Sequence, residues 1–265
     1  MSFFEAKNIT AGYGKKVILK ELSFSVEKNS LTGILGANGC GKTTLIRAIS
    51  SIIPYTGEIF INGTSTKALN SSKMARLASY IPQRSGISID ISLLDVVLMG
   101  FNPVLGLLER PSKKMVERAI DAIRAVGLCG KENENYMTLS EGQKQLTVLA
   151  RTLVSDAPLM LLDEPESALD LRHRYIMLSM IREWSEKGER CAIVTLHDPM
   201  LALEFCDKLI VMSDGRVETL YPKTDTLSHL EEALSKIYGT VTLSRIPDSS
   251  GKEHLVMLKN KEDII

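Results

Sequence analysis

The sequence has few aromatic side chains and no net charge. Phenylalanine, tryptophan and tyrosine make up 5% of its 265 residues, and 32 lysines and arginines balance 32 aspartates and glutamates. Few aromatics disfavour a surface that stacks on nucleic-acid bases. The balanced charge argues against a chain that coats nucleic acid or binds polyanions through a basic tail. We therefore expect no nucleic-acid partner.

Long hydrophobic runs and paired cysteines are also missing. The longest apolar stretch, residues 91–108, is interrupted by Asp95, Asn102 and Pro103, so it lacks the ~20 continuous apolar residues of a membrane span. The first ten residues have neither the basic nor the apolar segment of a signal peptide. The four cysteines show no C-x-x-C spacing, which disfavours a zinc site or a disulfide framework and fits a reducing cytosol.

The chain does have the composition of an ordinary globular protein, with 44% hydrophobic and 24% charged residues. Its length suits one domain with a small addition rather than two independent domains. We expect the domain to cover residues 1–222 and a C-terminal extension, residues 223–265, to pack on it. Within the domain we expect a helical subdomain at about residues 84–157, where Leu93–Met99, Lys113–Val126 and Glu141–Leu153 fit the 3.6-residue period of helices.

Other segments predict β-strands and therefore an α/β fold. Residues Phe3–Ile9 and Val17–Val26 are rich in β-branched and aromatic side chains, as strands are. Short apolar runs follow at Leu31–Leu35, Leu159–Leu162 and Cys191–Leu196. A run that is apolar throughout is typical of a parallel strand covered on both faces.

The C-terminal part of the sequence predicts a hairpin, a helix and two more strands. The hairpin joins Leu209–Met212 to Arg216–Leu220 through a turn at Ser213-Asp214-Gly215. Residues Leu227–Tyr238 fit a helix. Two strands that would lie at a sheet edge end the chain: Val241–Ile246 and His254–Leu258.

Residues 36–44 read Gly-Ala-Asn-Gly-Cys-Gly-Lys-Thr-Thr, which matches G-x-x-x-x-G-K-[ST] between a predicted strand and a predicted helix. Glycines let backbone N–H groups point into one concavity, and this loop and the helix N-terminus bind phosphate. Lys42 supplies charge to the β- and γ-phosphates, and the Thr43 hydroxyl is a ligand for Mg²⁺. The expected nucleotide contacts are Asn38, Gly39, Cys40, Gly41, Lys42, Thr43 and Thr44.

Two carboxylates, Asp163 and Glu164, directly follow the apolar run Leu159–Leu162. They would lie at the carboxyl edge of the sheet, where ligands bind in α/β folds. We expect Asp163 to hold Mg²⁺ through water and Glu164 to orient and polarise the attacking water. The alternative is a pair that only caps the next helix, and the phosphate-binding loop disfavours it.

A further segment, Leu139-Ser-Glu-Gly-Gln143, looks like the signature motif of the ATP-binding cassette (ABC) ATPases. The sequence resembles this family over most of its length, with its motifs in the expected order. The resemblance implies that Tyr13 stacks on adenine, that Gln83 forms the Q-loop and contacts Mg²⁺, and that His197 is the switch histidine. Together with Glu164, Gln83 and His197 would be the catalytic residues. It also implies nucleotide contacts from Ser140, Gly142, Gln143 and Asp170.

The family resemblance implies a fold and an assembly as well. The fold would be a P-loop NTPase core with an antiparallel β subdomain and an inserted α-helical signature subdomain. The assembly would be a head-to-tail homodimer with ATP sandwiched between the P-loop of one subunit and the signature motif of the other. Glu141 stands where the family most often has glycine, and Cys40 where serine is commoner. We expect Glu141 to point away from the nucleotide and Cys40 to be a small spacer.

The segment Leu93–Lys114 resembles the entry to the helical subdomain in ATPases of iron–siderophore, haem and cobalamin importers. The resemblance implies a peripheral subunit on the cytoplasmic side of the cell membrane that powers uptake of a metal chelate. Its partners would be permease subunits, contacted through the helical subdomain, and indirectly an extracytoplasmic substrate-binding protein. An apolar cluster in this segment could receive the permease or simply pack the core: Phe101, Val104, Leu105, Leu107 and Leu108.

Other members of the same family stay open as alternatives. A soluble ATPase of iron–sulfur cluster assembly, a molybdate or tungstate importer subunit and an exporter subunit would carry the same nucleotide motifs. The cargo does not touch such a subunit, so the motifs do not identify it. Soluble ABC ATPases of DNA repair carry a coiled-coil arm. The long heptad segment of such an arm is missing between Thr44 and Leu139, which disfavours this type.

Overall fold

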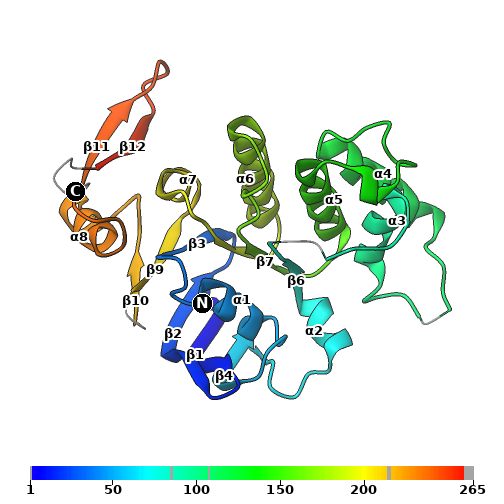
Figure 1. The fold of residues 1–265 in the computed structure, drawn as a ribbon, viewed down its shortest axis with the longest axis horizontal. Helices are drawn as coiled ribbons and strands as arrows, with labels where there is room; N and C mark the ends of the chain where they lie inside the picture. The colour runs from blue at the N-terminus through cyan, green and yellow to red at the C-terminus, as the bar shows by residue number, and fades with distance from the viewer. Residues whose placement is uncertain (1, 84–85, 107, 214–215, 260–265) are drawn as a thin grey trace.

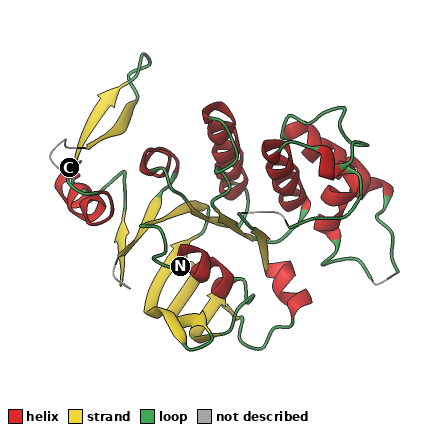
Figure 2. Cartoon of the chain, in the orientation of Figure 1, coloured by secondary structure: helices red, strands yellow, loops and turns green. Residues whose placement is uncertain are grey.

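Two β-sheets and the helices that cover them form the body of the molecule (Figures 1 and 2). The computed structural model describes residues 2–83, 86–106, 108–213 and 216–259. A four-stranded antiparallel sheet at the N-terminal end has the strand order β2-β1-β4-β5. Its strands are β1 (Ser2–Tyr13), β2 (Lys16–Glu27), β4 (Tyr55–Ile61) and β5 (Thr64–Ser65).

The second sheet has six strands in the order β10-β9-β3-β8-β7-β6. All neighbouring pairs are parallel except β9 and β10, which form the predicted antiparallel hairpin; positions 214 and 215 of its predicted turn lie outside the described residues. The predicted α/β fold is therefore confirmed. The strands are β3 (Ser30–Gly36), β6 (Ala78–Ile81), β7 (Leu159–Asp163), β8 (Cys191–Thr195), β9 (Lys208–Ser213) and β10 (Arg216–Leu220).

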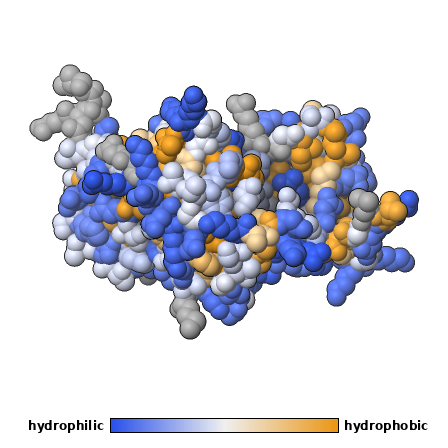
Figure 3. Space-filling model, turned by 90° about the horizontal axis from the view of Figure 1, so that it is seen from below, coloured by the Kyte–Doolittle hydropathy of each residue, from blue (hydrophilic) through white to orange (hydrophobic). Residues whose placement is uncertain are grey.

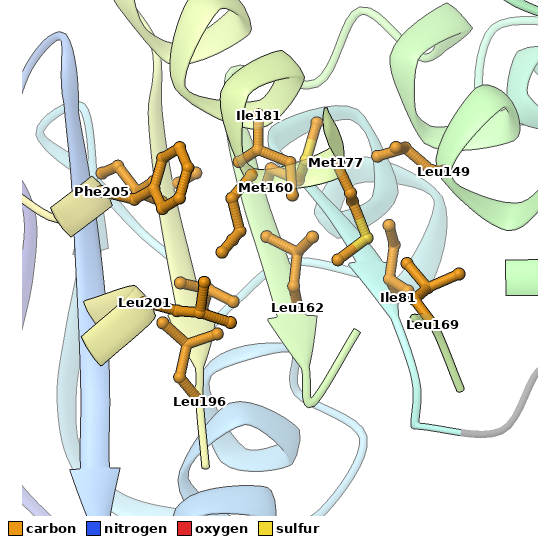
Figure 4. Packing of buried hydrophobic residues seen from close by; sticks show 14 of the residues in the cluster. Ile81, Leu149, Met160, Leu162, Leu169, Met177, Ile181, Leu196, Leu201 and Phe205 are labelled. Carbon is orange, nitrogen blue, oxygen red and sulfur yellow. The ribbon is translucent and has the colours of Figure 1, made fainter. Parts of the chain in front are cut away.

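The central strands are covered on both faces, as their apolar sequences predict. In β7, Met160 and Leu162 join one hydrophobic cluster, whereas Leu159 and Leu161 join the other. Figure 4 shows the first cluster between the sheet and three helices: α5 (Glu141–Val154), α6 (Leu171–Glu186) and α7 (Pro199–Phe205). The second cluster lies between the two sheets and α1 (Lys42–Ile49).

Helices inserted between β6 and β7 gather at one end of the molecule (Figure 1). Helices α3 (Leu93–Leu98), α4 (Lys113–Ala125) and α5 pack on one another. The predicted apolar cluster is divided, because Phe101 is a core residue whereas Val104 and Leu108 are exposed; Leu107 lies outside the described residues. The shorter elements nearby are α2 (Ser71–Leu77) and the 3₁₀ turns η1 (Met99–Phe101) and η2 (Tyr136–Thr138).

The C-terminal segment forms α8 (Leu227–Tyr238) and the strands β11 (Val241–Pro247) and β12 (Glu253–Lys259). The two predicted edge strands are present, and they pair with each other in a separate two-stranded hairpin. The hairpin buries Leu243 and Leu255 and packs on α7 and α8, which explains why it does not need an existing sheet. The boundary between residues 222 and 223 stays a prediction.

Candidate nucleotide site

The P-loop connects β3 to α1 through a turn that requires glycine at two positions. Gly39 and Gly41 have φ angles of 80° and 110°, in the left-handed region that other residues rarely adopt. Gly41 also directly precedes the first residue of α1. The loop therefore leads directly into the N-terminus of α1, which is the arrangement that the motif predicts for phosphate binding.

Lys42 lies over this loop. Its side chain is buried, and its ammonium group donates to the carbonyl oxygens of Gly36 at 2.8 Å and of Ala37 at 3.5 Å. The charge is thus fixed beside the concavity, where it can meet phosphate oxygens.

Two threonines join the P-loop to the ends of the neighbouring strands. The hydroxyl groups of Thr43 and Thr195 both donate to Asp163 Oδ1, at 3.1 and 3.0 Å. The Thr195 hydroxyl also accepts from the backbone N–H of Glu164 at 2.8 Å. Burial raises the pKa of Asp163, and the negative charge of Glu164 adds to this effect, while the two hydroxyl groups oppose it.

The three predicted catalytic side chains meet in one hydrogen-bonded group. Glu164 Oε1 lies 2.7 Å from His197 Nε2, and Glu164 Oε2 accepts a hydrogen bond from Gln83 Nε2. Glu164 has a φ of 49°, a backbone conformation that costs about 1–3 kcal/mol in a residue other than glycine. Glu164 directly follows β7, and in this conformation its carboxylate contacts both Gln83 and His197.

The oxygen atoms around Asp163 fit a magnesium ion. Mg²⁺ prefers carboxylate, hydroxyl and phosphate oxygens and usually keeps several waters. Thr43 and Asp163 supply such oxygens side by side, and the buried carboxylate of Asp163 would gain from a cation. No group of three or more acidic, histidine or cysteine side chains that could hold a metal occurs in the described part of the chain. A metal here would therefore depend on nucleotide oxygens and water for its remaining ligands.

Tyr13 is an accessible aromatic residue, 43% exposed, at the end of β1. Its hydroxyl accepts a hydrogen bond from Arg47 in the last turn of α1 at 3.2 Å. The same guanidinium also interacts with Tyr80 in β6. An exposed ring that is anchored through its hydroxyl group is suited to stack on a purine, as the sequence predicts.

The signature residues lie together at the start of α5. Ser140 caps the helix by accepting from Gln143 N–H, and Gln143 Oε1 accepts in return from Ser140 N–H. These groups and Asp170 line a cavity of about 860 Å³ between α4, α5 and α6. Glu141 is exposed and pairs with Lys144 at 2.9 Å.

Asp170 caps the next helix, α6. Its carboxylate accepts from the His173 N–H at 2.9 Å and contacts the His173 ring nitrogen Nδ1 at 2.8 Å. Both contacts, the backbone one foremost, lower the pKa of Asp170. The structure thus collects the predicted residues in two groups, one around the P-loop and one around the signature motif.

Three residues near the site were missed by the sequence analysis: Thr195, Glu166 and Tyr238. Glu166 accepts from His197 N–H at 3.1 Å, and the hydroxyl of Tyr238 donates to the His197 carbonyl at 3.4 Å. The position of Thr195, just before Leu196 and His197 at the end of a buried strand, was a usable signal. Tyr238 comes from the C-terminal helix, and no sequence pattern links it to His197.

Residues 19–167 match the ABC transporter family, and this span contains both the P-loop and the signature motif. The chain belongs to the ABC transporter family. A Helicobacter pylori protein named as an iron chelatin transport ATP-binding protein is 35% identical over 239 residues, which cover 89% of this chain and 92% of that protein. A hemin import ATP-binding protein of Bordetella bronchiseptica is 32% identical over 244 residues, 89% of this chain and 91% of the relative.

Solved ABC structures share the fold. One, described as a metal-chelate type ABC transporter in an inward-facing conformation, gives a TM-score of 0.81 at 23% identity and covers 99% of this chain and 100% of that one. A dimeric ATP-binding cassette bound to ADP and Pi gives a TM-score of 0.73, also at 23% identity, over 83% of this chain and 98% of that one.

These findings confirm four predictions: the ABC family, the ABC fold, ATP hydrolysis and the resemblance to ATPases of metal-chelate importers. ATP binding follows from the family. The roles of single site residues stay predictions. In the described residues, no helix has both the length and the apolar sequence needed to cross a membrane.

Proposed function

We propose that this ABC ATPase powers the import of a metal chelate of the iron–siderophore, haem or cobalamin type through a separate permease. The observation that carries the ATPase chemistry is the contact of Glu164 with both Gln83 and His197 beside the P-loop. The importer assignment is supported by relatives named for iron chelatin and hemin transport. The subunit would bind at the cytoplasmic side of the membrane, and an extracytoplasmic binding protein would supply the chelate.

The residues of this chain have distinct tasks in hydrolysis. The P-loop N–H groups and Lys42 bind the phosphates. Thr43, Asp163 and Gln83 would hold Mg²⁺, which neutralises phosphate charge when it is bound. Glu164 orients and polarises the attacking water, and His197 fixes the position of the Glu164 carboxylate. Phosphoryl transfer needs mainly this positioning and charge stabilisation.

A second copy of the chain would complete the site. The capped start of α5 presents N–H groups and the Ser140 hydroxyl to an open cavity, and a helix N-terminus attracts anions. In a head-to-tail dimer this end would cover the γ-phosphate held by the P-loop of the partner. ATP would then join two polar surfaces, so we expect dimerisation to require ATP.

A groove between α2, β6 and the inserted helices is the proposed permease site. Its volume is about 710 Å³, and its lining combines apolar and polar groups, with Ile52, Met74 and Met99 among the apolar ones. Figure 3 shows hydrophobic residues gathered towards the end of the molecule that carries α3, α4 and α5. A groove with such walls can receive an amphipathic helix of a partner. The exposed side chains of Val104 and Leu108 lie in the loop that follows η1.

Identification of the chains that co-purify with the protein from membranes tests the importer assignment. We expect a polytopic permease. Ile52→Asp, which places a charge in the groove, should release the permease. Leu258→Asp is the matched control, because Leu258 is similarly exposed (57%, against 54% for Ile52) but lies in β12, away from the groove. Co-purification of cluster-assembly scaffold proteins instead of a permease would contradict the proposal.

A further inference from the structure

A second glutamate, Glu166, lies in the loop that carries Glu164 and is almost fully buried, with 2% of its surface exposed. Carboxylate side chains are rarely buried to this extent unless they are paired. One oxygen, Oε1, accepts the backbone N–H of His197 at 3.1 Å. The other, Oε2, is buried with no hydrogen-bond partner among the described residues. None of the roles assigned to the ATPase motifs uses this group.

The buried environment of the Glu166 carboxyl group destabilises the folded state. Burial raises the pKa of its carboxyl group, an effect that the contact with the His197 N–H opposes. Leaving a buried polar oxygen without a partner costs roughly 1–3 kcal/mol. An apolar side chain of similar size would avoid both costs, so packing alone does not explain an acid at this position.

The loop geometry links Glu166 to the catalytic contact. Two short turns shape the loop: Ser167 N–H donates to the Glu164 carbonyl at 3.2 Å, and Leu169 N–H donates to the Glu166 carbonyl at 3.1 Å. The same loop therefore presents the Glu164 carboxylate to the His197 ring and the Glu166 carboxyl group to the His197 backbone. One loop therefore holds His197 at two points, its ring and its backbone N–H.

We propose that Glu166 is a positioning residue for ATP hydrolysis, which holds the His197 backbone so that its imidazole reaches Glu164. The proposal rests on the proposed catalytic role of His197. His197 follows β8 and has an exposed side chain, 45% accessible, so its ring gains little support from packing. Fixing the His197 backbone reduces the number of conformations that the ring can adopt and favours those in which it contacts Glu164. Orientation of this kind contributes directly to the rate of hydrolysis.

Two substitutions separate positioning from packing. Glu166→Met keeps the size of the side chain and removes the acceptor, and we expect kcat to fall about tenfold with little change in the KM for ATP, because orientation and not binding is lost. Glu166→Gln keeps an oxygen that can accept the N–H and should retain most of the turnover. Glu204→Gln is the matched control: it alters a carboxylate on α7 that contacts Lys252 and His254 but not His197.

A double-mutant cycle with His197→Ala decides the outcome. Once the imidazole is gone, Glu166→Met should cause little further loss, because the two residues act through the same contact. Amide hydrogen exchange gives a readout independent of activity, since the His197 N–H should exchange faster in Glu166→Met than in Glu166→Gln. Melting temperatures identify any variant that does not fold; if Glu166→Met is lost, Glu166→Ala, which also removes the acceptor, takes its place in the cycle with the same expected result.

The two hypotheses fail differently. If His197→Ala hydrolyses ATP at the parent rate, the catalytic role of His197 is wrong, and the inference about Glu166 falls with it. If His197→Ala loses most of its turnover but Glu166→Met retains the parent kcat, only the inference about Glu166 is wrong. Equal losses for Glu166→Met in the presence and absence of the His197 imidazole would also overturn it.

Discussion

Thr195 offers the sharpest test of how the site is held together, because one hydroxyl group supports both acidic residues. It is fully buried, donates to Asp163 Oδ1 at 3.0 Å and accepts from Glu164 N–H at 2.8 Å. Thr195→Val keeps the shape of the side chain but removes both interactions. A hydrogen bond to a charged group contributes about 1.5–3 kcal/mol, and an unsatisfied buried N–H costs a similar amount.

We therefore expect Thr195→Val to destabilise the fold by about 3 kcal/mol. For a chain of this size the melting temperature should fall by roughly 6–12 °C. Turnover should fall at least about tenfold, since the Glu164 backbone loses an anchor. Calorimetry and a steady-state ATPase assay measure the two effects, and Thr195→Ser, which keeps the hydroxyl, is the control. A Thr195→Val protein that melts and hydrolyses ATP like the parent would refute the reasoning.

Two other predictions concern the P-loop and the C-terminal hairpin. Lys42→Ala removes the ammonium group that bonds the Gly36 carbonyl and should weaken ATP binding by about ten- to a hundredfold in an equilibrium titration; unchanged affinity would contradict its assigned role. The ion pairs of His254 with Glu204 and Asp248 raise the His254 pKa above 6.5. The folded state thus binds this proton more tightly, so the stabilisation is complete below about pH 6.5 and is lost as pH rises through the raised pKa. His254→Gln should flatten this part of the melting-temperature profile, and an unchanged slope would show that other groups produce it.

The sequence predicted the nucleotide site well because its parts follow from local patterns. The P-loop is continuous in the chain, and Glu164 and His197 each follow a buried strand. Since β7 and β8 are parallel neighbours, their carboxyl ends bring these two side chains together. The apolar run before Asp163 and Glu164 predicted their place at this edge of the sheet, whereas the contact of Glu164 with His197 was not predicted.

Other parts could not be predicted from such patterns, or were overlooked. Helix α7 was overlooked because it has only seven residues. Asp198 as N-cap and Pro199 at the first helical position were usable signals for it. The strand β6 has four residues and contains the polar residue Ser79. It therefore lacks the continuous apolar run from which the other parallel strands were predicted. The burial of Glu166 depends on the path of the loop after β7, and a charged residue is ordinarily expected at the surface.

The central claim is that Glu164 activates water in a site that two copies of the chain share. Sedimentation of Glu164→Gln with and without ATP, with hydrolysis measured on the same samples, tests it most directly. The substitution keeps the size of the side chain and removes its charge, so we expect ATP to bind, turnover to be lost and the protein to sediment as a dimer only with ATP. Hydrolysis at the parent rate, or a protein that stays monomeric with ATP bound, would contradict the claim.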